Sequence, residues 1–375
     1  MSLRTVKNCI VCNGSNIAPF FKIPNYPIIL RPISKEMHDH LDGQKMPRTM
    51  PLEVGMCQDC THLMLTKRLS DDLEKLLYTS LYSTYISMLE MGIGAAGVDN
   101  FLKLFSNHLV SKIPQGASIL EIGCYDGYIL QQLGEQGFHA EGCDPSDGAS
   151  IGIKKGLNIK KSFFCKGLYP TDNFDVVFNR HVIEHIEALP EFLANITDVA
   201  KKTSYLCFET PNANFYLSKG LLDPFHPEHL SVFTTVSLRK CLESHGISVT
   251  EMFSETKDLI TICKQEENIP THRFGDEKDH LLALASEFTQ RHEENINKLR
   301  SIIEKVNSEN ASLALWGAGS SSLRFLTMAE GIGLKTNKLL IVDKDTRKQG
   351  QRFFIDSDIP PIASPDVLKG QSVDY

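Results

Sequence analysis

The stretch Leu120-Glu121-Ile122-Gly123-Cys124-Tyr125-Asp126-Gly127 decides the fold of the central part of the chain. Residues 118–122 form a short apolar run, which predicts a buried strand. The glycines at 123 and 127 allow the backbone to turn and to approach a ligand closely. Residues 128–133 have a helical pattern, so the stretch predicts a strand, a glycine-rich turn and a helix in that order.

Short apolar runs alternate with helical segments beyond this turn. Strands are predicted at 139–143, 174–178, 204–208 and 259–263, and a helix near 188–201. This alternation predicts a parallel sheet covered by helices on both faces. The fold class is therefore α/β, with a doubly covered, Rossmann-like core.

The rest of the chain divides around this core, and we expect five regions. Residues 1–66 are irregular and rich in proline, 67–115 form a helical connector with helices near 71–77 and 98–109, and 116–265 hold the sheet. Residues 266–310 are a linker with one long helix at 276–309, which we expect to pack on its neighbours rather than form a dimer coil. Residues 311–375 predict a small Rossmann-like α/β domain, which is short enough to be incomplete.

Composition restricts the class of protein. Among 375 residues, 39 are Lys or Arg and 46 are Asp or Glu, giving a net charge of −7. This charge disfavours nucleic acid as a partner. We find no apolar run long enough to span a membrane and no apolar leader. We therefore expect a cytoplasmic monomer or homodimer whose ten cysteines are reduced.

Two Cys-x-x-Cys pairs predict a structural zinc site. They are Cys9 with Cys12, and Cys57 with Cys60. Each two-residue gap lets both sulfurs reach one ion, and four thiolates complete a tetrahedron. His62 follows closely and could substitute as a ligand, but we expect a surface histidine.

The glycine-rich turn differs from the dinucleotide fingerprint, which needs glycine at three set positions. Its acidic residue and two glycines instead resemble motif I of class I S-adenosylmethionine methyltransferases. Asp144 follows the next strand, where a carboxylate can accept ribose hydroxyls. Residues 173–186 resemble the methyltransferase strand-four segment. The candidate donor-binding residues are Glu121, Gly123, Cys124, Asp126, Gly127, Asp144, Pro145, Asn179 and Arg180.

Candidate acceptor residues follow the next strand. Glu209 and Asn212 lie where α/β sheets place ligands. His226-Pro227-Glu228-His229 then gathers groups able to transfer protons near neutral pH. A metal site at the two histidines would need a third ligand, and a structural role for His229 remains an alternative.

The whole chain resembles the sugar C-methyltransferases of bacterial deoxysugar pathways, which act on TDP-linked keto sugars. The match rests on the four cysteines, the residue stretch 85–87, the donor turn, His185, and Val342-Asp343 followed by Lys348-Gln349-Gly350. The resemblance implies an N-terminal zinc domain, a central methyltransferase domain and a C-terminal Rossmann-like domain. The family's Tyr-His-Glu-His segment reads His226-Pro227-Glu228-His229 here, so only the last two residues carry over.

The resemblance also implies a mechanism that proceeds through an enolate. His229 is expected to act as the base with Glu228 orienting it, while His226, His185 and Tyr85 bind the oxyanion or the sugar. S-adenosylmethionine and a structural Zn²⁺ are the implied cofactors. The alternatives are an O-methyltransferase acting on a sugar hydroxyl, which needs only one base, and an inactive zinc-ribbon binding protein.

Overall fold

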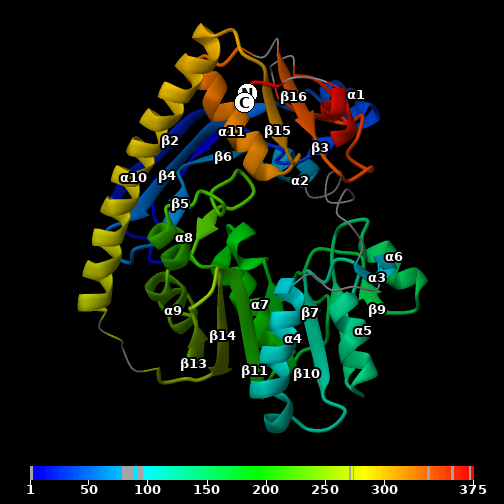
Figure 1. Cartoon of the computed structure of the whole chain (residues 1–375). Helices are drawn as coiled ribbons and strands as arrows, with labels where there is room; N and C mark the ends of the chain where they lie inside the picture. Colours follow the sequence, from blue (N-terminus) through cyan, green and yellow to red (C-terminus); the bar gives the residue numbers. More distant parts are fainter. Residues whose placement is uncertain are drawn as a thin grey trace.

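The computed structural model describes residues 3–77, 88–91, 96–269, 272, 274–335, 338–355, 359–370 and 373–375. Figure 1 shows two lobes, with the large sheet below and the N-terminal and C-terminal segments above it. The long helix α10 (Gly275–Ser308) runs along both lobes. Among the described residues, no helix is both long and apolar enough to cross a bilayer.

The lower lobe is built on a seven-stranded sheet. Its order is β13 (Ile247–Phe253), β14 (Asp258–Gln265), β11 (Ala200–Pro211), β10 (Phe174–Arg180), β7 (Ser118–Ile122), β8 (His139–Cys143) and β9 (Asn158–Lys160). The five strands from β11 to β9 are parallel, β14 runs antiparallel to β11, and β13 runs antiparallel to β14 and so in the same direction as the five. The predicted parallel sheet is therefore confirmed, although β9 and β13 were not predicted.

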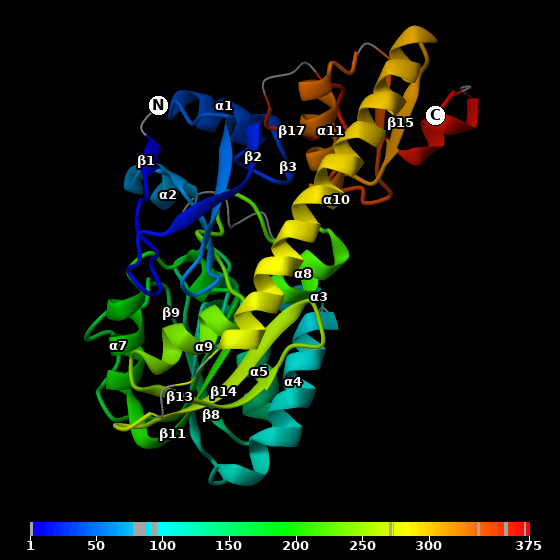
Figure 2. The same cartoon turned by 90° about the vertical axis from the view of Figure 1, so that its left-hand side faces the viewer.

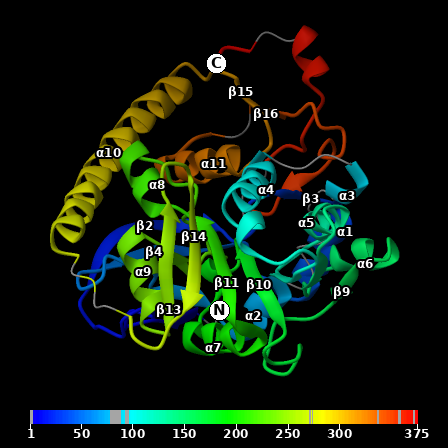
Figure 3. The same ribbon diagram turned by 90° about the horizontal axis from the view of Figure 1, so that it is seen from below.

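Helices cover both faces of this sheet (Figure 3). On one face, α4 (Ala96–His108) and α5 (Tyr128–Glu135) pack against the strands through residues such as Phe101, Phe178 and Leu133. On the other face, α7 (Leu189–Val199) and α9 (Thr235–Glu243) pack through residues such as Leu193 and Leu238. The helix predicted near 188–201 begins one residue later, at Leu189, and ends two residues earlier, at Val199, because β11 begins at Ala200. The carboxyl ends of the parallel strands face the upper lobe in Figure 1.

The N-terminal segment is more regular than the sequence predicted. Strands β2 (Ile17–Pro27), β4 (Thr49–Cys57) and β5 (Leu63–Leu65) form one antiparallel sheet with β12 (Ser231–Val232), which comes from the methyltransferase region. The prediction of an irregular segment was wrong because Pro19 and Pro24 of β2 sit at two interruptions of register, between Pro19 and Phe21 and between Ile23 and Tyr26, and Pro27 ends the strand. A strand tolerates proline at such irregularities, since no ladder hydrogen bond is required there.

The C-terminal segment packs on the N-terminal one. Strands β15 (Leu313–Trp316) and β16 (Leu339–Val342) are parallel and flank α11 (Ser320–Ile332). Strand β17 (Arg352–Phe353) pairs with β3 (Pro32–Ile33), and Phe354 is buried in a cluster with Ile28 and Ile29. Helix α10 covers the junction, as Figure 2 shows, and Phe288 of α10 stacks on Phe20 of β2.

The remaining elements are short. They are β1 (Leu3–Thr5), β6 (Lys67–Leu69), α1 (Lys35–Gly43), α2 (Asp71–Leu76), α3 (Met88–Met91), α6 (Ala149–Lys154), α8 (Ala213–Lys219) and the 3₁₀ turns Val110–Lys112, Ile183–His185 and Pro365–Gly370. The predicted helices near 71–77 and 98–109 correspond to α2 and α4, and the helix predicted at 276–309 is α10.

Candidate active site

Two buried polar side chains lie at the ends of neighbouring central strands. Glu121 of β7 is 4% exposed and Asn179 of β10 is 1% exposed. Among the described residues, the Glu121 Oε2 atom and both amide atoms of Asn179 have no hydrogen-bond partner. Unpaired buried polar groups are costly and rare, so a ligand that reaches this edge would relieve a real penalty. Burial raises the pKa of Glu121 to about 8, although the nearby Arg180 opposes that shift.

The turn between β7 and α5 requires both of its predicted glycines. Gly123 and Gly127 have φ values of +77° and +80°. A Cβ atom on Gly123 would lie 2.4 Å from Cγ2 of Val182, and one on Gly127 would lie 2.7 Å from Cδ1 of Ile159. Side chains at these positions would therefore be strained and would collide with their neighbours.

Two carboxylates hold this turn in place. Asp144, at the end of β8, accepts hydrogen bonds from the backbone N–H groups of Tyr125 at 2.9 Å and Ser146 at 2.8 Å. Asp126 is fully buried and accepts from the N–H groups of Leu89 at 2.9 Å and Tyr128 at 3.1 Å. Asp144 thus fixes the turn against the second strand, and Asp126 ties α3 to the start of α5.

Arg180 and Glu209 form an ion pair at the ends of β10 and β11. The Arg180 Nη2 atom lies 3.0 Å from Glu209 Oε1, and its Nε bonds the other carboxylate oxygen. Glu209 is 1% exposed, and the guanidinium carbon lies 5.0 Å from the ring centre of Phe101. A buried carboxylate needs such a partner, so each residue fixes the other at the edge of the sheet.

Three imidazoles meet beyond the ends of β10 and β11. The ring centres of His226 and His229 are 3.7 Å apart, and those of His185 and His229 are 4.8 Å apart. His229 Nδ1 donates to the carbonyl oxygen of Pro224 at 2.9 Å, and His185 Nδ1 donates to that of Glu228 at 2.7 Å. A neutral imidazole that donates through Nδ1 has its lone pair at Nε2. His229 therefore carries its lone pair at Nε2 when it is neutral.

Burial keeps two of these histidines neutral. It lowers the pKa of His226 to about 3, and the nearby His185 adds to the effect. It also lowers the pKa of His229 well below its ordinary value, with His226 and His185 contributing. Among the described residues, Nδ1 of His226 has no hydrogen-bond partner. This atom is therefore available to a ligand.

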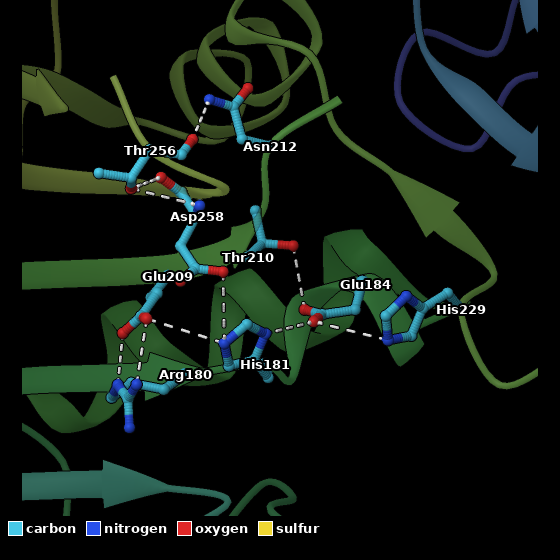
Figure 4. Close-up of polar contacts among 9 residues, drawn as sticks. All are labelled: Arg180, His181, Glu184, Glu209, Thr210, Asn212, His229, Thr256 and Asp258. Atoms are coloured by element: carbon cyan, nitrogen blue, oxygen red, sulfur yellow. Dashed lines mark hydrogen bonds and ion pairs between the residues drawn. The ribbon is translucent and has the colours of Figure 1, made fainter. Parts of the chain in front are cut away.

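A carboxylate that the sequence did not single out connects these histidines to the edge of the sheet (Figure 4). Glu184 is 0% exposed, and its Oε2 accepts a hydrogen bond from Thr210 Oγ1 at 3.0 Å. Its Oε1 lies 3.3 Å from Nδ1 of His181 and 3.9 Å from Nε2 of His229. Sequence patterns could not identify this network, because its members come from three separate segments.

The N-terminal sheet holds the acceptor histidines in position. Strand β12 begins two residues after His229 and pairs with β5, while the N–H of Leu65 donates to the carbonyl of Leu230 at 3.1 Å. His62 is fully buried, and its Nε2 lies 3.2 Å from Oγ of Ser231. The expectation that His62 is a surface histidine was therefore wrong, because β12 covers it.

The four predicted zinc ligands converge. The sulfurs of Cys9 and Cys60 are 3.6 Å apart, as are those of Cys12 and Cys57, and all four lie within 4.8 Å of one another. Sulfurs bound tetrahedrally at a zinc distance of ~2.3 Å would be ~3.8 Å apart. The donor set and its spacing therefore fit a structural Zn²⁺. The cluster packs against the large sheet, because Cys9 and Cys57 share a buried cluster with Phe233.

Two further groups have potential ligand atoms within 4.8 Å, namely Glu184 with His185 and His229, and His181 with Glu209 and Asp258. Thr210, Arg180 and two backbone carbonyls already bond members of these groups, and we assign no ion to them.

The other predicted site residues have varied surroundings. The Asn212 side chain forms hydrogen bonds to the backbone: it accepts from the N–H of Asn214 and donates to the carbonyls of Ser254 and Thr256. Cys124 is buried against Gly142 and Pro145 is half-buried beside Asp144. Glu228 contributes its carbonyl to His185. Tyr85, with the rest of the stretch 85–87, lies outside the described residues.

Comparison with known proteins identifies the lower lobe. Residues 96–252 match the family model described as a methyltransferase domain. Residues 96–252 are a class I S-adenosylmethionine methyltransferase domain. The match covers six strands of the large sheet, from β7 to β13 in chain order with β12 of the other sheet among the matched residues, and it ends before β14.

Two curated relatives match part of this chain. The human mitochondrial ubiquinone biosynthesis O-methyltransferase is 28% identical over an alignment of 182 residues, and the match covers 40% of this chain and 47% of that protein. The ubiquinone biosynthesis O-methyltransferase of Rhodopseudomonas palustris (strain BisB5) is 30% identical over an alignment of 108 residues, and the match covers 27% of this chain and 42% of that protein. The chain thus spans less than half the length of either relative. A solved methyltransferase from Archaeoglobus fulgidus is 20% identical, with a TM-score of 0.39 over 47% of this chain and 97% of its own.

The donor edge of the methyltransferase domain fits S-adenosylmethionine. The unpaired atoms of Glu121 and Asn179 lie at the ends of β7 and β10, and the glycine turn at Gly123 follows the end of β7 directly. Asp144 keeps a lone pair for a ribose hydroxyl, since each carboxylate oxygen can accept more than one hydrogen bond. These residues are the ones that would hold the cofactor.

Proposed function

We propose that the protein is an S-adenosylmethionine-dependent C-methyltransferase that acts on a nucleotide-linked keto sugar, with His229 as the base. The observation that carries this proposal is the state of His229, a buried neutral imidazole with its lone pair at Nε2 beside the donor edge. The order of a four-cysteine cluster, a methyltransferase domain and a C-terminal α/β segment supports the sugar acceptor, since the resembling family shares it.

The chain's own residues account for the proton transfer. His229 Nε2 takes the proton from the carbon next to the sugar carbonyl, the C–H electron pair moves towards the carbonyl, and an enolate forms. Nδ1 of His226, which lacks a partner among the described residues, would donate to the enolate oxygen. When bound, S-adenosylmethionine supplies an electrophilic methyl group for the nucleophilic carbon.

The experiment offers the protein S-adenosylmethionine with a pool of TDP-linked 4-keto and hydroxy sugars, in ordinary and deuterated water. Mass spectrometry should show the gain of one methyl group on a keto sugar, with solvent deuterium entering beside the carbonyl. The His229→Gln variant should lose both signals, whereas His280→Gln, at an exposed position on α10, should keep them. Methylation without deuterium entry would contradict the enolate.

O-methylation of a hydroxyl is the second candidate. Both reported curated relatives are O-methyltransferases, and a single base such as His229 suffices for this reaction. A methyl gain on a hydroxy sugar, with no exchange at carbon, would favour this candidate.

A further inference from the structure

Glu184 is a buried carboxylate to which the reaction above gives no role. It lies in the 3₁₀ turn Ile183–His185 and is 0% exposed. Taking a carboxylate out of water costs several kcal/mol unless charges and hydrogen bonds compensate. The surroundings of Glu184 should therefore show what stabilises its charge and what that charge acts on.

Two residues keep Glu184 ionised. Thr210 donates to Oε2 at 3.0 Å, and His181 Nδ1 lies 3.3 Å from Oε1. Burial opposes ionisation of Glu184, but the contact with His181 outweighs it and lowers the carboxyl pKa. Partial desolvation opposes protonation of His181, whose side chain stays partly exposed, yet Glu184, Glu209 and Asp258 together raise its pKa.

The backbone of His181, which makes this contact, has an unfavourable conformation. Its φ value is +52°, in the left-handed region that residues other than glycine rarely adopt. Its Nε2 lies 3.7 Å from Glu209 Oε1 and 3.8 Å from Asp258 Oδ1, and its side chain is 42% exposed. Charges of alternating sign therefore run from the sheet edge through His181 and Glu184 to His229 (Figure 4). Such strain persists where the surrounding structure enforces it and is typical of functional sites.

The other groups that face His229 would oppose its protonation. They are the imidazoles of His226, His185 and His181, with the Arg324 guanidinium of α11 beyond His226. Glu228 precedes His229 in the chain and bonds His185 through its carbonyl. Glu184 is thus the buried carboxylate that faces the nitrogen expected to receive the proton, at 3.9 Å.

We propose that Glu184 is a positioning residue whose carboxylate is the counter-charge for the imidazolium that forms when His229 takes a proton at Nε2. His181 and Thr210 hold that carboxylate ionised and in place. The inference rests on the proposed function for the reaction it serves, but the electrostatic pairing is a property of this chain alone. The proton moves from the acceptor to His229, and Glu184 gains no bond and loses none.

The first test measures the pairing without substrate. Histidine side chains of the ¹⁵N-labelled full chain are titrated by NMR from pH 8 down to the lowest pH at which the chain stays folded, because the pKa of His229 lies well below its ordinary value, and the His229 signal is assigned by its loss in His229→Gln. Glu184→Gln should move the onset of His229 protonation down by about 1–3 pH units, as loss of an opposite charge at this distance implies. Glu184→Asp should restore part of the shift, and Glu191→Gln, at an exposed position on α7, should cause none. A His229 titration that is the same in Glu184→Gln and wild type would overturn the proposal.

The second test measures proton removal. With S-adenosylhomocysteine in the donor site, deuterium entry into the keto sugar should slow by about 10- to 100-fold in Glu184→Gln, and binding of S-adenosylhomocysteine should be unchanged. An unaltered exchange rate in this variant would also refute the role of Glu184. Absence of exchange in the wild type would instead count against the proposed acceptor, and the NMR titration would still decide the pairing.

Discussion

Replacing Gly123 by alanine should lower the free energy of unfolding by more than the cost of a left-handed backbone conformation alone. The added Cβ atom would lie 2.4 Å from Val182 Cγ2, in a residue whose φ is +77°. Val182 follows His181 in the segment that leads to Glu184, so relief of this contact would also disturb the acceptor side.

The magnitude can be separated into two parts. The left-handed conformation costs a residue other than glycine about 1–2 kcal/mol. Forcing an extra methyl group into a packed site costs about 1–3 kcal/mol more. Gly137 provides the matched control, because its φ is +89° but no atom lies within 4 Å of its Cβ position. We therefore expect Gly137→Ala to lose only the conformational cost, and Gly123→Ala to lose the conformational cost and the cost of the collision.

Urea denaturation of the two variants measures this difference, and calorimetric titration with S-adenosylhomocysteine measures the effect on the donor site. Gly123→Ala should weaken binding, whereas Gly137→Ala should not. Adding Val182→Ala to Gly123→Ala should recover much of the stability lost to the collision. Equal unfolding free energies for the two single variants, or no recovery in the double variant, would refute the reasoning.

Three other changes test separate parts of the structure. Cys57→Ser should reduce bound zinc, measured by plasma mass spectrometry, from one equivalent to none. It should also lower the melting temperature, because Cys57 joins the cysteine cluster to the end of β4. Retention of zinc in this variant would contradict the proposed zinc site. The pKa of Glu121 in the folded state is raised to about 8 from 4.5, so the folded chain binds this proton more tightly than the unfolded chain. The free energy of unfolding should therefore fall as the pH rises from 4.5 to about 8. Glu121→Gln should reduce this dependence of the unfolding free energy on pH. Arg180→Met should cost about 3–5 kcal/mol because it removes the hydrogen-bonded partner of the buried Glu209 carboxylate and leaves, among the described residues, only the more distant ion pair with His181 Nε2 at 3.7 Å. Arg180→Met with Glu209→Gln should recover stability in the same denaturation assay.

The sequence predicted the features that depend on neighbouring residues. The strand at 118–122 and the turn at Gly123 and Gly127 were predicted because burial and positive φ are imposed on consecutive residues. The four cysteines were identifiable for a similar reason, since each pair is joined by a two-residue turn.

Features that depend on distant residues were missed. Glu184 obtains its role from Thr210 and His229, which lie on other segments and reach it only in the folded chain. The two-residue strand β12 is too short to have a hydrophobic period, and it exists because β5 provides a partner. The eleven-residue strand β2 was missed because it contains prolines, which usually argue against a strand. The interruptions of register that accommodate them form only when β2 pairs with β4.

The pairing of β12 with β5 has a consequence for synthesis of the chain on the ribosome. Strand β5 is synthesised before its partner β12, because Ser231 and Val232 are translated more than 160 residues later. One edge of β5 is therefore unpaired when it leaves the ribosome. At roughly 5–20 residues per second, that delay is about 10–30 s. During this interval the nascent chain carries an unpaired strand edge, which is prone to bind other chains. The pairing that completes this edge therefore cannot form until translation has passed His229 and reached Ser231 and Val232.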